Sequence, residues 1–370
     1  MSTSSSHDGK VIITCAITGS IPHPIDVTPT CPSRRTRSST LRPRPPKLAL
    51  RSCIFTPGDP ETGRPDQRAD AFAPFLSCIK QGTDAVVNLT SGGSPFMKEE
   101  RIQPSVRFKP EPASFNMGSM NFGLFPQLNR FKEFKHDWER QYLESTRDLV
   151  FRNTFRDEFA VTALSANGTR FEFECYDVGH LYNLAHFAER GLIKPPFLVQ
   201  TVFGILGGIG THSEDVMHMR RTADRLFNAI TAGPYLGAGR MQMPIAAMAA
   251  AMSAHVRVGL EDSLWIGKGQ LARSNGEQVR RVRSIVEGLG LTPATPDEAR
   301  RRCRCEEHPA GAHEGNVPGG KSAQPLSRLP QPAAQRRDMG DRDQVLRTHR
   351  GSCPARLGRA RLGAAVRARA

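Results

Sequence analysis

The 370-residue sequence predicts an α/β protein whose parallel strands close into a (β/α)8 barrel of the TIM type. Short apolar runs alternate with helical stretches between residues 10 and 301, which is typical of a parallel sheet covered by helices. A closed barrel of this length leaves no sheet edge exposed. A doubly wound open sheet is the second choice, because no G-x-G-x-x-G motif follows any predicted strand.

Six strands and six helices are predicted. The first strand, Lys10–Thr18, is a nearly continuous apolar run, as expected for a strand buried on both faces. The other strands are Ala85–Thr90, Ala113–Met117, Arg170–Asp177, Phe197–Gly204 and His255–Asp262. The helices are Asp66–Gln81, Phe131–Thr146, Gly179–Glu189, Ser213–Phe227, Ile245–Ser253 and Gly269–Gly288. A barrel needs two more strands, and the gaps in the pattern fall at residues 22–57 and 228–235.

The net charge of +15 would suggest a nucleic-acid partner if it were spread over the chain. It is concentrated in residues 22–57, with a net charge of +6, and in residues 303–370, with +7, which leaves +2 elsewhere. We therefore expect no nucleic-acid partner. No apolar run reaches the ~18 residues of a membrane span. The start, MSTSSSHDGK, has no signal-peptide core, and we expect residues 1–9 to be disordered and the protein to be cytoplasmic.

Two interior carboxylates are predicted on the strand Arg170–Asp177. Glu172 and Glu174 lie on one face of it, because alternate residues of a strand point the same way. Barrel strands are covered on both faces, so this pair needs a metal or a cation as a partner. Surface salt bridging is the structural alternative, which the flanking residues Phe171, Phe173 and Cys175 disfavour.

Other polar residues end predicted strands, where the active sites of barrel enzymes lie. Glu261 and Asp262 follow an apolar run, and Arg257 stands four residues before Glu261. Thr90-Ser91-Gly92-Gly93 ends a second strand, and its hydroxyls and turn amides can bind a carboxylate or an oxyanion. The alternatives are a helix cap for Asp262 and an ordinary tight turn for residues 90–93.

Seven segments, in order, resemble the β-keto acid cleavage enzymes, a family that includes the 3-keto-5-aminohexanoate cleavage enzyme. The segments are KVIITCAITGS, VVNLTSGG, SFNMGSMNFG, FEFECYDVGH, VFGILGG, LGAGR and VRVGLEDSLW. The resemblance extends from about residue 10 to residue 301, apart from the two gaps. It implies a metal-dependent (β/α)8 barrel whose second strand carries H-x-H. The sequence contains no such motif.

A shifted reading frame restores the motif. If residues 50–58 are coded CTT CGA TCT TGC ATC TTC ACG CCC GGG, reading from the third base gives S-I-L-H-L-H-A-R, with the two histidines near Cys53–Thr56. The same shift from Thr30 onward gives LPVTPDEIVDAAAAAAKAGASILHLHAR. That string has a Thr N-cap, acidic residues in the first turn, an alanine-rich helix and a glycine stop. Shifting Ala229–Leu236 gives DYRWSVL, a plausible seventh strand.

We therefore interpret residues 22–57 and 228–235 as frame-shifted, with the second strand and the first helix of the barrel lost. The Arg- and Pro-rich tail, residues 302–370, is interpreted as disordered or frame-shifted, and its Cys303-x-Cys305 as accidental. The segments are either sequencing errors or a real inactive gene. If the printed sequence is real, the protein is expected to be non-catalytic.

The resemblance also assigns roles to residues. It implies Glu261 as the third ligand of a divalent metal such as Zn²⁺, beside the two histidines. It implies Arg257 and Asp262 as the pair that assists proton transfer or grips the substrate carboxylate, and Glu174 as the general base or an orienting group. The implied substrate-contacting residues are Thr90, Ser91, Gly92, Gly93, Ser114 and Asn116.

The implied reaction is that of a transferase. A β-keto acid condenses with the co-substrate acetyl-CoA and yields acetoacetate and a new acyl-CoA by a retro-Claisen route. The resemblance also implies a homo-oligomer, a tetramer. The alternative within enzymes is a metal-dependent barrel hydrolase or aldolase that uses Glu172 and Glu174 with Glu261 and Asp262.

Overall fold

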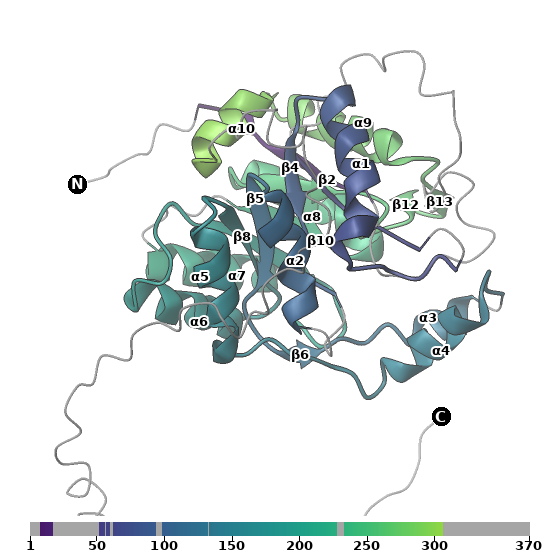
Figure 1. The fold of residues 1–370 in the computed structure, drawn as a ribbon. Helices are drawn as coiled ribbons and strands as arrows, with labels where there is room; N and C mark the ends of the chain where they lie inside the picture. The colour runs from purple at the N-terminus through teal and green to yellow at the C-terminus, as the bar shows by residue number, and fades with distance from the viewer. Residues whose placement is uncertain are drawn as a thin grey trace, which may run out of the picture. The chain divides into compact units, whose positions relative to one another are not determined.

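Eight parallel strands close into a barrel in the computed structural model (Figure 1), which confirms the predicted TIM-type fold. The structure describes residues 8–17, 52–55, 57–59, 62–93, 98–131, 133–227 and 233–305. The barrel strands are β2 (Ile13–Ala16), β3 (Ser52–Phe55), β4 (Val86–Leu89), β5 (Pro112–Asn116), β8 (Arg170–Cys175), β9 (Leu198–Phe203), β10 (Pro234–Gly237) and β11 (His255–Val258). Their order around the barrel follows the chain, and β11 closes it against β2.

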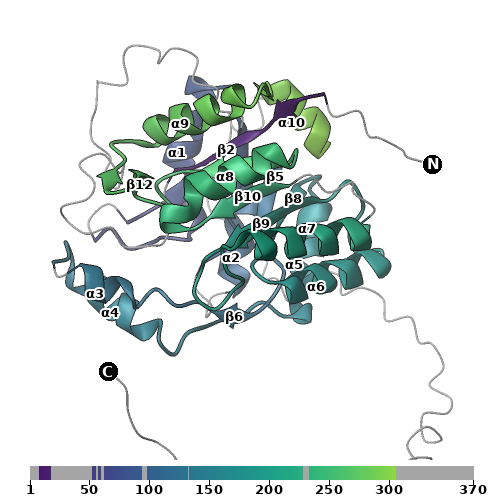
Figure 2. The same cartoon turned by 180° about the vertical axis from the view of Figure 1, so that it is seen from behind.

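Helices surround the barrel on its outer face (Figure 2). They are α1 (Ala69–Gly82), α2 (Lys98–Phe108), α5 (Glu158–Ser165), α6 (Val178–Glu189), α7 (Ser213–Phe227), α8 (Gln242–Ala251) and α9 (Asn275–Gly288), while α10 (Pro296–Cys303) lies at one end of the barrel. Their apolar faces pack on outward-facing strand residues such as Val199 and Val256, both at most 2% exposed. None of the described helices is long and apolar enough to cross a membrane.

The predicted loss of the second strand is wrong. Ser52–Phe55 forms β3 and pairs in parallel with β2 and β4, with Ile54 opposite Asn88. The residues S-C-I-F are apolar enough to occupy a buried parallel strand, so the segment forms a strand without the shifted reading frame. The second gap is also filled, because Pro234–Gly237 forms β10. The segment in which the lost first helix of the barrel was expected, residues 18–51, lies outside the described residues. Residues 1–7, 228–232 and 306–370 also lie outside them.

The end of the barrel at which the strands begin is covered by α10. Arg300 of this helix donates from Nε to Oε2 of Glu111 at 2.7 Å, and both side chains are buried. Ala299 packs with Ile12 and Val86 in a small apolar cluster. Just before the barrel, β1 (Lys10–Val11) pairs with β14 (Thr292–Pro293), the short strand that leads into α10.

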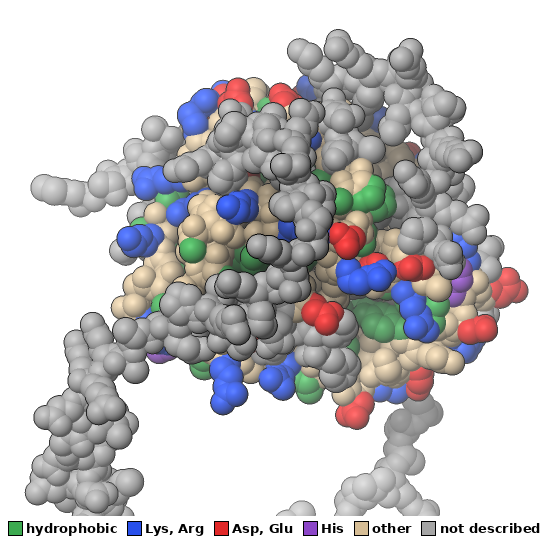
Figure 3. Space-filling view, in the orientation of Figure 1, with side chains coloured by type: hydrophobic (Ala, Val, Ile, Leu, Met, Phe, Trp, Pro, Cys, Tyr) green, Lys and Arg blue, Asp and Glu red, His purple; other side chains and the backbone are tan. Residues whose placement is uncertain are grey.

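A helical hairpin stands apart from the ring of helices (Figures 1 and 2). It consists of α3 (Gln127–Arg130) and α4 (Asp137–Ser145), and the antiparallel pair β6 (Met120–Asn121) and β7 (Val150–Phe151) connects it to the barrel. On the face drawn in Figure 3, basic and acidic side chains are interspersed over the described surface.

Candidate active site

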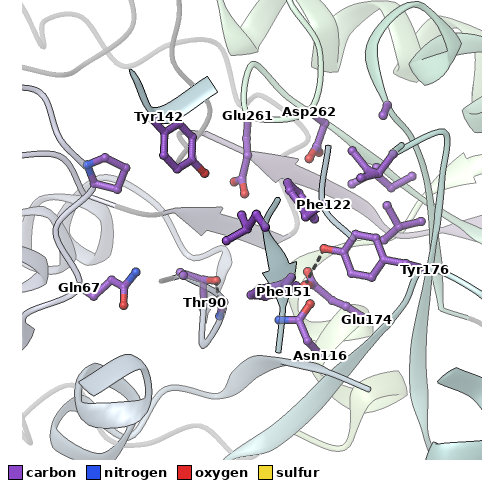
Figure 4. A pocket seen from close by; sticks show the side chains of 18 of the residues that line it. Gln67, Thr90, Asn116, Phe122, Tyr142, Phe151, Glu174, Tyr176, Glu261 and Asp262 are labelled. Atoms are coloured by element: carbon purple, nitrogen blue, oxygen red, sulfur yellow. Dashed lines mark hydrogen bonds between the residues drawn. The ribbon is translucent and has the colours of Figure 1, made fainter. Parts of the chain in front are cut away.

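A cavity of about 560 Å³ opens at the end of the barrel where the strands finish. Glu261 and Asp262 reach into it from one side, and Glu174 and Asn116 from the other (Figure 4). It is lined by Arg64, Pro65, Gln67, Thr90, Gly92, Gly93, Asn116, Phe122, Trp138, Gln141, Tyr142, Ser145, Leu149, Phe151, Glu174, Tyr176, Gln200, Val202, Ile205, Leu236, Ala238, Arg257, Glu261 and Asp262.

Arg257 is the centre of the polar network in this cavity. Its side chain is 4% exposed, and its Nε and Nη2 atoms each lie 2.9 Å from an oxygen of Asp262. Its Nη1 atom donates to Oε1 of Glu174 at 3.2 Å and to Oε1 of Gln200 at 3.4 Å. Its Nη2 atom is also 3.4 Å from Oε1 of Glu261. One guanidinium therefore faces three carboxylates.

The chain enters the cavity after β11 by a turn that requires glycine. Gly259 has a φ of +153°, and a Cβ atom there would lie 1.9 Å from the carbonyl oxygen of Ala16. The turn places Glu261 and Asp262 at the barrel mouth, where the amide of Glu261 donates to that carbonyl at 3.3 Å. Within the described chain, Oε2 of Glu261 is buried and accepts no hydrogen bond.

Burial and charge shift the pKa values of these groups. Burial raises the pKa of Glu261 to about 8 and also raises the pKa of Glu174, while Arg257 opposes both shifts. Burial acts to lower the pKa of Arg257, but the carboxylates of Asp262, Glu261 and Glu174 hold it well above its usual value. Burial, reinforced by the neighbouring carboxylates of Asp262, Glu174 and Glu172, thus favours a protonated Glu261 at neutral pH.

Glu172 lies deeper in the barrel than Glu174. Its Oε2 accepts a hydrogen bond of 2.9 Å from Nδ2 of Asn88, and its Oε1 has no partner among the described residues. The carboxyl group is 2% exposed, and burial raises its pKa to about 7. Glu172 does not line the cavity. The structure thus gives the two predicted interior carboxylates separate surroundings, an amide for Glu172 and the guanidinium for Glu174.

The residues expected to contact substrate fall into two groups. Thr90, Gly92, Gly93 and Asn116 line the cavity, and Oδ1 of Asn116 has no described hydrogen-bond partner. Ser91 and Ser114 do not line it. The Ser91 hydroxyl donates instead to the carbonyl oxygen of Ser114, and the Ser114 hydroxyl lies 3.4 Å from Oγ1 of Thr90. These serines join the ends of β4 and β5 beneath the cavity.

Aromatic side chains also line the cavity. The Phe122 ring lies 5.7 Å from Phe151 and 6.2 Å from Tyr176, both edge-to-face. The Tyr176 hydroxyl lies 3.4 Å from Oε2 of Glu174. Trp138 and Tyr142 of α4 complete this aromatic wall, with their rings 6.3 Å apart.

The residues described here do not form a metal site. No cluster of three or more His, Cys, Asp or Glu side chains suited to a metal ion occurs among them. Glu261 offers a free buried oxygen, which suits a ligand, but β3 supplies no histidine beside it. The Cys303-x-Cys305 pair lies at the end of α10, where Cys305 is buried.

Sequence reasoning did not single out Gln200, Asn88 or Tyr176. Gln200 is fully buried, and its Nε2 donates to Oε1 of Glu174 at 2.9 Å. Asn88 is the one polar residue of the strand VVNL, and Gln200 stands with Thr201 in the otherwise apolar strand LVQTVF. Because a buried polar side chain requires a partner, that pattern could have marked both as members of an interior network.

Three curated proteins illustrate what this chain is similar to. A 3,5-dioxohexanoate:acetyl-CoA acetone transferase from Paraburkholderia graminis is 56% identical over 293 residues, 79% of this chain and 94% of that protein. A 3-dehydrocarnitine:acetyl-CoA trimethylamine transferase from Rhizobium meliloti is 30% identical, over 80% and 96% of the two chains. A 3-keto-5-aminohexanoate cleavage enzyme from Acetoanaerobium sticklandii is 32% identical, over 65% and 79%.

The family match covers the barrel and its C-terminal helix. Residues 58–304 match the beta-keto acid cleavage enzyme family. This range contains Arg257, Glu261 and Asp262 at the end of β11 and Glu174 on β8, and it begins after β3. The chain therefore belongs to the beta-keto acid cleavage enzyme family.

Proposed function

We propose that this protein transfers acyl groups between a β-keto acid and acetyl-CoA. The keto acid loses a proton from the carbon between its keto and carboxylate groups, and that carbon forms a bond to the thioester carbonyl. The CoA sulfur moves to the original keto carbon, and the bond between that carbon and the former α-carbon breaks. The proton returns to the departing carbanion, so that acetoacetate and a new acyl-CoA result.

The observation that carries the proposal is the guanidinium of Arg257, held by Asp262 beside Glu174 in the cavity. Its Nη1 and Nη2 atoms can bind the substrate carboxylate and the developing enolate oxygen. Glu174 is the group proposed to accept the proton, since burial raises its pKa and strengthens it as a base. The Thr90 hydroxyl, which accepts from the Gly92 amide at 3.0 Å, and the Gly93 amide are proposed to bind the second oxyanion.

We propose that the substrate carries an uncharged group beyond its keto carbon. The wall of Phe122, Phe151 and Tyr142 offers aromatic surface to that group, and Arg64 is the one cation from the described chain that lines the cavity besides Arg257. An ammonium would lack an ionic partner at this wall, and a second carboxylate would find only Arg64 among the described cations. The relative that is 56% identical is named for 3,5-dioxohexanoate, whose distal group is an uncharged ketone.

The resemblance also implies a divalent metal, which in this family would act as a Lewis acid at the keto acid. Among the described residues only Glu261 matches the implied ligands, and one carboxylate does not make a metal site. Ile54 pairs with Asn88, which contacts Glu172 inside the barrel, so position 54 faces the interior. The shifted frame would place its first histidine across Cys53 and Ile54. We propose metal dependence for the protein that carries this histidine pair.

A peptide mass map of the protein from its native source shows whether residues 22–57 are a frame error or are real. A peptide ending in SILHLHAR would make the printed segment a frame error, and we then expect about one metal ion per chain by elemental analysis. Peptides that contain SCIFTPGDPETGR would make the printed sequence real. We then expect no bound metal and no turnover.

The activity itself is tested with 3,5-dioxohexanoate and acetyl-CoA, with and without added Zn²⁺, by mass spectrometry of both products. We expect acetoacetate and a new acyl-CoA from the native protein and neither from its Arg257→Gln variant. Free acetate with CoA and no acyl exchange would indicate a hydrolase and would contradict the proposal.

We also propose a cytoplasmic homo-oligomer, a tetramer by resemblance. Cys175 is a buried free thiol, as suits a reducing compartment. Light scattering of the purified protein would give a mass four times that of the chain if the tetramer is correct.

A further inference from the structure

Two arginines from distant parts of the chain lie over a single indole ring. The guanidinium carbon of Arg240 is 4.9 Å from the centroid of the Trp265 ring, and that of Arg130 is 6.0 Å from it. Arg240 belongs to the short 3₁₀ turn Gly239–Met241 that follows β10, and Arg130 ends α3. Trp265 begins β12 (Trp265–Gly267), three residues after Asp262.

This cluster lies at the mouth of the active-site cavity. Asp262 and Ala238 both line the cavity. Three residues of chain span at most about 11 Å, so the backbones of Trp265 and Arg240 lie within that distance of cavity-lining residues. Arg130 belongs to the same hairpin as Trp138 and Tyr142, which form part of the cavity wall; its helices α3 and α4 pack side by side (Figure 1).

The cationic groups of this cluster are available to an anion. Arg130 and Arg240 are exposed, Trp265 is half-buried, and neither guanidinium forms an ion pair with a carboxylate of the described chain. Lys268 is exposed in the turn after β12. A guanidinium held against an aromatic ring has a fixed plane, and its fork of N–H donors matches a phosphate group. Aromatic and guanidinium faces also stack on nucleobases.

The geometry points to Arg130, Arg240 and Trp265 as the binding site for the 3′-phospho-ADP part of coenzyme A. This inference rests on the proposed use of acetyl-CoA. The guanidiniums take the phosphates, the aromatic and guanidinium faces offer a platform to the adenine, and the pantetheine arm enters the cavity toward Arg257. Arg64, whose guanidinium carbon is 5.7 Å from the Trp138 ring, lines the cavity and offers a further cation.

Binding measurements test this assignment without requiring turnover. The probes are adenosine 3′,5′-bisphosphate, CoA and pantetheine, titrated by calorimetry into the full chain and into Arg130→Gln/Arg240→Gln. We expect the double variant to bind the bisphosphate and CoA about a hundredfold more weakly, because each of the two lost charged hydrogen bonds contributes about tenfold. Pantetheine affinity should not change. The matched control is Arg225→Gln, since the guanidinium carbon of Arg225 on α7 lies 5.9 Å from the Tyr182 ring on α6.

The outcomes separate this inference from the proposed function. If the wild-type chain binds the bisphosphate, the double variant does not, and no acyl transfer is found even in a protein that carries the SILHLHAR peptide, the nucleotide site stands and the proposed function fails. Unchanged bisphosphate affinity in the double variant, or an equal loss in Arg225→Gln, would overturn the site. In a protein that turns over, the double variant should raise KM for acetyl-CoA and leave KM for the keto acid and for S-acetylpantetheine unchanged.

Discussion

Arg257 and Asp262 form a bidentate ion pair, with Nε–Oδ2 and Nη2–Oδ1 distances of 2.9 Å each. The pair is buried, and two parallel hydrogen bonds fix the plane of the guanidinium. That plane directs Nη1 toward Glu174 and Gln200 and leaves Nη2 near Glu261. Asp262 therefore positions Arg257. The two residues are only five positions apart in the sequence, at the end of one strand. The sharp turn at Gly259 makes this short-range pairing possible.

The first prediction concerns the geometry of this pair. Arg257→Lys keeps the charge but cannot form the fork, so Asp262 and Glu174 cannot both be satisfied. We expect kcat/KM to fall at least a hundredfold in a protein with turnover, and the free energy of unfolding to fall by about 3 kcal/mol. Denaturant unfolding and steady-state kinetics measure the two effects.

The matched control is Arg283→Lys, which alters an exposed pair with Glu287 on α9. It should change the stability by less than about 1 kcal/mol and the kinetics not at all. If Arg257→Lys behaved like this control, the bidentate geometry would have no role at the site.

The second prediction concerns the pH dependence of stability through Glu172. Burial raises its pKa from 4.5 to about 7 in the folded protein. Between these values the folded state binds more protons than the unfolded state, so stability falls as pH rises through this window. Glu172→Gln keeps an acceptor for Asn88 and removes the titration. Between pH 5 and pH 8 the wild type should lose about 2 kcal/mol more of unfolding free energy than the variant does.

Chemical denaturation at a series of pH values provides the measurement. Glu287→Gln, at an exposed site, should leave the wild-type pH dependence intact. Parallel pH profiles for wild type and Glu172→Gln would mean that Glu172 titrates near its usual value.

The repetitive part of the fold could be predicted from the sequence. Ser213–Phe227 forms a helix with the predicted bounds, and Arg170–Cys175 lies within its predicted strand. Four helices of the described chain were not predicted, namely α2, α3, α5 and α10. Lys98–Phe108 contains Pro104, which normally disfavours a helix interior, and Glu158–Ser165 spans barely two turns. The predicted helix from Phe131 starts only at Asp137, where His136 and Glu139 form a capping box.

The site was less predictable than the fold, for a physical reason. Arg257, Glu261 and Asp262 stand at one strand end, so a local pattern marks them. The aromatic wall depends on contacts between Phe122, Phe151 and Tyr176, which come from separate segments. No local pattern encodes such contacts. The same holds for Arg130, which reaches Trp265 only because the α3–α4 hairpin folds back over the barrel mouth.

The third prediction tests the aromatic wall. Phe122→Ala removes an edge-to-face partner of both Phe151 and Tyr176 and enlarges the space for the distal group of the keto acid. We expect KM for the keto acid to rise about tenfold, since burying a large aromatic contact is of that order. KM for acetyl-CoA should stay within twofold. Phe155→Ala is the control, because Phe155 is 53% exposed and does not line the cavity. If KM rose equally for the keto acid and for acetyl-CoA, Phe122 would act only through the packing of the protein and not through contact with the distal group.

The last prediction concerns Gly93, which follows β4 and lines the cavity. Its φ is +146°, a region that is essentially restricted to glycine, and a Cβ atom there would lie 2.1 Å from Nε2 of Gln67. Gly93→Ala therefore adds a clash to backbone strain. We expect it to lower the free energy of unfolding by about 2–3 kcal/mol and to raise KM for the keto acid. Thermal unfolding and steady-state kinetics measure the two effects.

Two further variants separate the clash from the strain. Gly191 also has a positive φ, +70°, but a Cβ atom added there would meet no atom within 4 Å. Gly191→Ala should therefore lower the free energy of unfolding by about 1 kcal/mol and leave the kinetics unchanged. Gln67→Ala in the Gly93→Ala background removes the clashing amide and leaves the strain. It should recover a minor part of the lost stability, because the clashing atoms are at the end of a flexible side chain and the backbone strain remains. If the double variant is no more stable than Gly93→Ala alone, backbone strain accounts for the whole effect and Gln67 plays no part in shaping this side of the cavity.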